Sequence, residues 1–217
     1  MKTVQDAYLA YRIMPSLQLH QLRVAAVAKV VCDHFEGELD KDSIVLACLF
    51  HDMGNILKSD LTIFPDFVQP EGLEYWEGVK KDFAQKYGPN EHTATSAITR
   101  EIGIPASSIT LIEKMGFSKM KEIQDGGSFE LKILEYGDCR VAPRGIVPAA
   151  ERFAEGSNRY TYRYTSSEEM HTHFLYLTDS AYEIEKQIFS HCSIRPEDIT
   201  NESVAPLFDL LRNLEIA

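Results

Sequence analysis

Apolar residues recur at steps of three and four along most of the chain, which is the spacing of one face of an α-helix. The clearest case follows Pro15-Ser16, where one face carries Leu17, His20, Val24, Val27 and Val31. The sequence shows no series of alternating strands, no internal repeat and no low-complexity segment. This pattern predicts an all-α fold, with helices joined by short polar or Pro/Gly connectors.

Capping residues and prolines mark where the predicted helices begin. Asp42-Ser43 is a capping pair for a second helix, which we expect to run to Gly54 with His51 and Asp52 in its last turn. Further helices are predicted from about Leu73 to Tyr87, from Asn90 to Gly103, from Ile104-Pro105, from Ser128 to Val141, after Pro143 and Pro148, from about Ser167 to Phe189, and near Val204 to Leu214. Residues 59 to 75 combine prolines with aromatic residues, which is typical of an irregular loop that walls a pocket.

Histidine and carboxylate side chains occupy positions where this pattern calls for aliphatic residues. His20 lies on the apolar face of the first helix, and His51-Asp52 follows an apolar run that ends at Phe50. Asp138 shares a helix face with Leu131, Leu134 and Val141. Because an unpaired buried carboxylate loses several kcal/mol of hydration, the four side chains predict a shared divalent cation. Nitrogen and oxygen donors without thiolate suit Mn²⁺, Fe²⁺, Co²⁺, Ni²⁺ or Mg²⁺ better than structural zinc.

The order His20, His51-Asp52, Asp138 on successive helices resembles the motif of the HD-domain superfamily of metal-dependent phosphohydrolases. The resemblance covers about residues 16–142. It implies an HD-domain helical bundle with these four side chains as metal ligands, and it extends to relatives that cleave nucleoside phosphates, alarmones or cyclic dinucleotides. We therefore expect a single domain over residues 1–217, with an HD core at about 16–142 and a C-terminal helical extension at about 143–217.

Two positions depart from better-known relatives. Many of them carry Lys or Glu three residues after the motif Asp, whereas this chain has Asn55, which we expect to contact the substrate. Dinuclear relatives commonly add two histidines before the last Asp, whereas His92 is the single histidine in that interval. One ion per site is therefore favoured. His92, in the first turn of its helix, is expected to bind phosphate or act as a general acid, with a surface position beside Glu91 as the alternative.

Basic and aromatic residues supply candidates for substrate binding. Lys58, Arg140 and Arg144 are the predicted anion ligands, since Arg suits bidentate recognition of phosphate. Arg152, Arg159 and Arg163 are more typical of ordinary surface ion pairs. The residues available to stack on a nucleobase are Phe64, Phe67, Tyr75 and Trp76, although aromatic residues at this spacing usually belong to the core.

The overall composition restricts the partners. A net charge of −11 over 217 residues repels phosphate backbones, so a nucleic-acid duplex is not expected to bind, whereas a small phosphorylated substrate can bind where the pocket is locally positive. No apolar stretch approaches the roughly 18 residues of a membrane span, so we expect no membrane partner and a cytoplasmic location. The cysteines form no Cys-x-x-Cys pair and are assigned no chemistry. A homo-oligomer remains open.

The leading hypothesis is a metal-dependent phosphohydrolase that acts on a small phosphoester such as a nucleotide, by a metal-bound hydroxide. Asp52 would serve as a ligand and as a proton acceptor. Two alternatives stay open, a di-iron HD-type oxygenase and a non-catalytic nucleotide-binding module. Two irons per chain would indicate the first, and binding without turnover would indicate the second.

Overall fold

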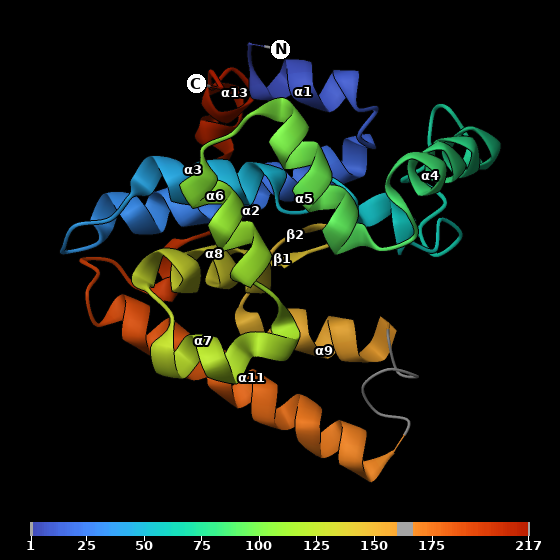
Figure 1. Cartoon of the computed structure of the whole chain (residues 1–217). Helices are drawn as coiled ribbons and strands as arrows, with labels where there is room; N and C mark the ends of the chain where they lie inside the picture. Colours follow the sequence, from blue (N-terminus) through green and yellow to red (C-terminus); the bar gives the residue numbers. More distant parts are fainter. Residues whose placement is uncertain (1, 160–166, 217) are drawn as a thin grey trace.

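The computed structural model describes residues 2–159 and 167–216 and is built almost entirely of helices (Figure 1). In chain order the helices are α1 (Val4–Ala10), α2 (Pro15–His34), α3 (Lys41–Phe50), α4 (Leu73–Tyr87), α5 (Glu91–Ile102), α6 (Ala106–Lys114), α7 (Met120–Gly126), α8 (Phe129–Cys139), α9 (Ala149–Arg159), α11 (Glu168–Phe189), α12 (Asn201–Val204) and α13 (Phe208–Arg212). Short 3-10 helices span Asn55–Leu57, Phe117–Lys119, Pro196–Asp198 and Ala205–Leu207, and strands β1 (Val141–Ala142) and β2 (Gly145–Ile146) form a small antiparallel hairpin. The predicted all-α fold is confirmed, and Arg163 lies outside the described residues.

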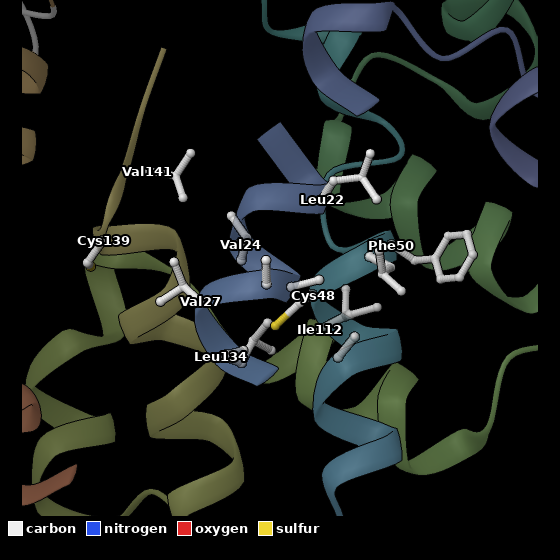
Figure 2. Close-up of a cluster of buried hydrophobic side chains, with 14 of the residues drawn as sticks. Leu22, Val24, Val27, Cys48, Phe50, Ile112, Leu134, Cys139 and Val141 are labelled. Carbon is white, nitrogen blue, oxygen red and sulfur yellow. The ribbon is translucent and has the colours of Figure 1, made fainter. Parts of the chain in front are cut away.

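Helix α2 lies at the centre and packs against both α3 and α8. Their apolar faces meet in a buried cluster that includes Val24 and Val27 of α2, Cys48 of α3 and Leu134 of α8 (Figure 2). The burial of these faces holds the three helices in a fixed arrangement. The predicted metal ligands lie on or directly after these same three helices.

Helix α3 begins and ends earlier than predicted. Its cap is Asp40, whose side chain accepts a 3.1 Å hydrogen bond from the Ser43 N–H, so the Asp42-Ser43 pair lies inside the first turn. The helix ends at Phe50, and His51 is its C-terminal cap residue. His51 and Asp52 therefore lie in the turn that follows α3, and the prediction that they belong to its last helical turn is wrong. The four residues after Phe50 form a tight turn that leads into a 3-10 helix, which a helical periodicity cannot distinguish from one more turn of α-helix.

Other helix starts agree with the sequence. Asn90 caps α5 as predicted, and Ser128 and Ser167 stand at the predicted starts of α8 and α11, where their side chains also act as caps. Helices α1 and α7 were not predicted. For α1 the signal was present, because Thr3 and Asp6 cap the helix reciprocally.

The C-terminal part packs onto the core from two sides. Helices α7, α9 and α11 gather next to α8, at the opposite end of the molecule from α1, as Figure 1 shows. Helix α13 packs against α2 and α1, close to the N-terminus. The predicted last helix near residues 204–214 is divided into α12, a 3-10 helix with Pro206 in its first turn, and α13. None of the described helices has the length and apolar character needed to cross a membrane.

Candidate metal centre

The turn that carries His51 and Asp52 is fixed by two polar contacts. The Asp52 N–H donates a 3.2 Å hydrogen bond to the side-chain oxygen of Gln21, a buried residue of α2. The Gly54 N–H donates a 2.9 Å bond to Thr95 Oγ1 of α5. A Cβ on Gly54 would lie 2.4 Å from the carbonyl oxygen of Glu91, so the approach of this turn to α5 requires glycine. The turn is thus held between α2 and α5.

His51 presents one ring nitrogen to the centre of the site. Its Nδ1 lies 2.8 Å from the carbonyl oxygen of Cys48. Because a carbonyl only accepts, Nδ1 must carry the proton, and Nε2 of the neutral ring is left with a lone pair. Nε2 is buried and has no hydrogen-bond partner among the described residues. A buried nitrogen lone pair without a donor is the arrangement expected of a metal ligand whose tautomer is fixed from behind.

Two carboxylate oxygens and a second imidazole lie around this nitrogen. His51 Nε2 is 3.7 Å from Asp52 Oδ2 and 3.8 Å from Asp138 Oδ1. His20 Nε2 is 3.6 Å from the same Asp52 oxygen and 3.2 Å from the same Asp138 oxygen. Adjacent ligands at roughly 2.1 Å from one cation would be roughly 3.0 Å apart, so these separations leave room for a single ion with a small contraction. The donor atoms of His20, His51 and Asp52 lie within 4.8 Å of one another and could hold a divalent metal ion, and an Asp138 oxygen lies close to both imidazoles.

The ionisation of these groups reflects their crowding. Burial lowers the pKa of His51, but the charges of Asp52 and Asp138 raise it more, to about 9. Burial raises the pKa of Asp138, yet the neighbouring imidazoles of His20 and His51 outweigh burial and bring the pKa well below its usual range. The centre is therefore a negatively charged environment that holds a proton on His51 when no cation is present. A divalent cation would replace that proton.

Asn55, predicted to bind substrate, contacts the candidate metal ligand Asp52. Its Nδ2 donates a 2.6 Å hydrogen bond to Asp52 Oδ2, which is the oxygen that faces both imidazoles. The other amide atom, Oδ1, is buried and has no partner among the described residues. Asn55 also lines the cavity described below, so its position allows both roles.

Lys58 and His92 lie together at the cavity wall, on either side of Glu91. Lys58 Nζ is 3.8 Å and His92 Nε2 is 3.6 Å from Glu91 Oε1. The His92 side chain is 74% exposed, which matches the alternative of a surface histidine beside Glu91 in position, although the residue also lines the cavity. Sequence reasoning treated Glu91 only as a neighbour of His92, whereas its carboxylate is the common partner of both basic groups.

The prediction that Arg140 binds substrate is wrong. Its guanidinium is buried beneath the β1–β2 hairpin and donates to the carbonyl oxygens of Val147 at 2.6 Å, Pro196 at 3.2 Å and Ile199 at 3.1 Å, and to the hydroxyl of Tyr136. All these acceptors are protein groups, so the guanidinium is not available to a substrate. It links the C-terminal extension to α8 instead. The sequence could not reveal this role, because two of the acceptors are the main-chain carbonyls of Pro196 and Ile199, which lie far away along the chain.

Arg144 also lies away from the described cavity wall. Its side chain is 69% exposed and pairs with Asp66 at 3.0 Å, and its guanidinium lies over the rings of Phe64 and Phe67. It therefore braces the outer side of the loop at residues 59–72, and the structure does not support it as a substrate ligand.

A cavity of about 1140 Å³ opens beside the metal centre. His20, His51, Asp52 and Asp138 line one part of it, and an apolar part is lined by Leu17, Ile112, Met115, Phe117, Phe153 and Phe174. Phe64 and Phe67 stack with ring centroids 4.8 Å apart and line the wall formed by the 59–72 loop, as the sequence predicted for that segment. Trp76 is instead a core residue, and Tyr75 packs edge-on against it.

The sequence analysis gave no role in this cavity to Glu135, Arg152 or Arg159, although each of them lines it. Glu135 is buried one helical turn before Asp138 and accepts a 2.8 Å hydrogen bond from the Gly116 N–H. The sequence signal for Glu135 was its position three residues before Asp138, which places both side chains on the same side of a helix. Arg152 and Arg159 do form the predicted ion pairs, both with Glu155, but they also line the cavity.

Comparisons with known proteins agree with this geometry. The family model for the HD domain matches residues 18–154, a span that begins in α2, contains all four candidate ligands and ends in α9. A search of curated proteins and a search of solved structures each found no significant match.

Proposed function

The chain belongs to the HD-domain family, and on this premise we propose that it is a metal-dependent hydrolase of a small phosphoester such as a nucleotide. The observation that carries the proposal is the buried Nε2 of His51, which has no hydrogen-bond partner among the described residues and faces oxygens of Asp52 and Asp138. In the metal-free site the charges of Asp52 and Asp138 hold a proton on this ring, and a bound cation would take the place of that proton. The family provides the expectation of a metal, and this atom supports it in the present chain.

We propose that one divalent ion binds to His20, His51, Asp52 and Asp138. His20, His51 and Asp52 each offer a donor atom within 4.8 Å of the others, which supports a single centre. When bound, such an ion would supply Lewis acidity and lower the pKa of a coordinated water. Asn55 would hold the Asp52 carboxylate in place, so that the same carboxylate can act as a ligand and accept a proton.

The neighbouring charges suit a phosphoryl group next to the centre. Lys58 and His92 lie on one wall and compete for the single carboxylate of Glu91, so the three groups together leave positive charge when His92 is protonated. We propose that Lys58 stabilises charge on the phosphoryl oxygens and that His92 donates a proton to the leaving group.

The size of the cavity supports a substrate larger than a simple phosphate ester. Small-molecule sites commonly measure roughly 300–1000 Å³, and this one measures about 1140 Å³. Its wall holds the stacked pair Phe64 and Phe67 on one side and Phe117 on another, and aromatic rings are common partners of nucleobases. A nucleotide would place its phosphate at the metal centre and its base against the apolar part.

A metal-by-substrate screen tests the proposal. Phosphate release from a nucleotide panel should require added Mn²⁺, Co²⁺ or Mg²⁺ and should disappear in His51→Ala and Asp52→Ala. His34→Ala, which changes an exposed histidine at the end of α2, is the matched control and should retain activity. Metal-independent release, or release that persists in Asp52→Ala, would contradict the proposal. Thermal stabilisation by nucleotides without any product would indicate a binding module, and two irons per chain after anaerobic loading would indicate an oxygenase.

A further inference from the structure

Two guanidinium groups of α9 share one carboxylate. Arg159 binds Glu155 with two nitrogens, through Nε at 2.7 Å and Nη2 at 3.1 Å, whereas Arg152 reaches it with Nη1 alone at 3.3 Å. Since Glu155 carries one negative charge and has two cationic partners, this group of three has a net positive charge. The weaker contact belongs to Arg152.

Arg152 also has a hydrogen-bond donor that the described protein does not use. Its Nε is buried and has no partner among the described residues. The side chain is 22% exposed and lines the cavity that contains the metal centre. A buried N–H without an acceptor is unfavourable, so an anionic oxygen that enters the cavity would gain an interaction that water does not fully supply.

Helix α9 leaves space for this guanidinium at one position. A Cβ on Gly156, one turn after Arg152, would lie 3.1 Å from Arg152 Nη1, which is closer than an ordinary van der Waals contact. The glycine therefore allows the guanidinium to lie against the helix beside Glu155. An alanine at residue 156 would shift the guanidinium without removing its charge.

We propose that Arg152 binds phosphate oxygens of the substrate, so that α9 contributes an anion-binding group to the same cavity that the four candidate metal ligands line. The planar guanidinium offers parallel N–H groups that match two oxygens of a phosphate, and its charge is maintained at every relevant pH. Arg152 replaces Arg140 and Arg144 in this role, since neither of those side chains lines the cavity, and Arg140 is bonded to main-chain carbonyls while Arg144 pairs with Asp66. The inference rests on the proposed function for the identity of the anion.

Binding of inorganic phosphate tests the inference without turnover. The affinity of the full chain for phosphate is measured by calorimetry, both metal-free and loaded with Mn²⁺. Arg152→Ala should weaken binding by about 10- to 100-fold, because a charge-assisted hydrogen bond is lost. Arg152→Lys, which keeps the charge without the fork, should give an intermediate loss, and Gly156→Ala should weaken binding at unchanged net charge. Arg144→Ala removes an arginine that contacts Phe64 and Phe67 in the loop at residues 59–72. This control variant should bind phosphate like the wild type.

The outcomes separate this inference from the proposed function. Phosphate affinity within twofold of the wild type in Arg152→Ala would overturn the inference, even if the enzyme hydrolyses nucleotides. Phosphate affinity that depends on Arg152, in a chain that hydrolyses no phosphoester, would support the inference and contradict the proposed function. If Arg152→Ala does not fold, as judged by its thermal unfolding, Arg152→Lys and Gly156→Ala decide the question by the same measurement.

Discussion

Asn55 donates a 2.6 Å hydrogen bond to Oδ2 of Asp52, the same oxygen that lies 3.6 Å from Nε2 of His20. The amide therefore orients a candidate metal ligand at the oxygen that faces the imidazoles. An amide donor can do this without adding charge, whereas a Lys or Glu at this position would change the charge of the centre by one. The chain thus has a neutral group holding Asp52.

Asn55→Ala should weaken Mn²⁺ binding by about tenfold or more, because partners behind metal ligands typically contribute 10- to 100-fold in affinity. Isothermal titration of the metal-free protein measures the effect. Asn213→Ala, which removes an exposed asparagine near the C-terminus that bonds to Asp209, serves as the control. Equal affinities for Asn55→Ala and the wild type would mean that Asp52 is oriented without the amide.

Binding of a divalent cation should release a proton from His51. The pKa of this ring is about 9 in the metal-free site, above its ordinary value of 6.5, so the ring is protonated at neutral pH. Coordination through Nε2 requires the lone pair, so affinity should rise with pH, by up to about tenfold per unit, and level off above about pH 9. Calorimetry at pH 7.5 in buffers of different ionisation enthalpy should detect about one proton per ion. Binding without proton release would show that His51 is not a ligand.

The same shift affects the metal-free fold in a defined direction. Because the folded pKa of His51 is raised, the stability that it contributes is fully present below pH 6.5 and is lost as pH rises through about 9. Added Mn²⁺ should therefore stabilise the protein most at alkaline pH. Thermal unfolding with and without the ion, at pH 6 and pH 9, measures the difference.

The sequence was sufficient to predict which histidine and carboxylate side chains come together, but not which arginines line the cavity. His20 and Asp138 were found because a polar residue in an apolar helical phase is conspicuous, and helical phase depends only on nearby residues. Arg140 and Arg152 carry no such signal. Which of them faces the cavity depends on tertiary packing. Arg140 is held by the carbonyl oxygens of Pro196 and Ile199, which are distant in the chain, and Arg152 lines a cavity whose wall includes residues of α2 and α11.

The helix boundaries near the site could be predicted only where the stabilising contacts are local in the chain. Asn90 was identified as a cap because capping depends only on the four consecutive residues from Asn90 to Thr93. The end of α3 was misplaced because the turn at 51–54 is stabilised by Gln21 and Thr95, from α2 and α5. Local periodicity cannot report such contacts.

Glu135→Gln should reduce the pH dependence of stability in the metal-free protein. Burial raises the pKa of Glu135 to about 7 from its ordinary 4.5, against the lowering effect of the Gly116 N–H. Because the pKa of Glu135 is raised in the folded state, the neutral acid stabilises the fold fully below pH 4.5. This contribution to the free energy of unfolding, roughly 3 kcal/mol, is lost as pH rises through about 7. Glutamine keeps an acceptor for Gly116 but does not ionise. Urea unfolding at pH 4.5 and pH 8 should show a smaller difference for this variant, whereas the exposed-site control Glu122→Gln should behave like the wild type.

Gly54→Ala should disrupt the turn that carries the metal ligands. The added methyl group would lie 2.4 Å from the Glu91 carbonyl oxygen and 2.8 Å from Ala94 Cβ, and both neighbours belong to the first turn of α5, which cannot move as a flexible side chain would. Overpacking of this kind costs about 1–3 kcal/mol, so we expect a lower free energy of unfolding together with weaker Mn²⁺ binding.

Gly78→Ala is the matched control, because no atom lies within 4 Å of its Cβ position in α4 and alanine favours a helix interior by about 0.5–1 kcal/mol. The two alanines should therefore shift urea unfolding in opposite directions. A Gly54→Ala protein with wild-type stability and metal affinity would show that the turn can move away from α5 without losing the arrangement of His51 and Asp52.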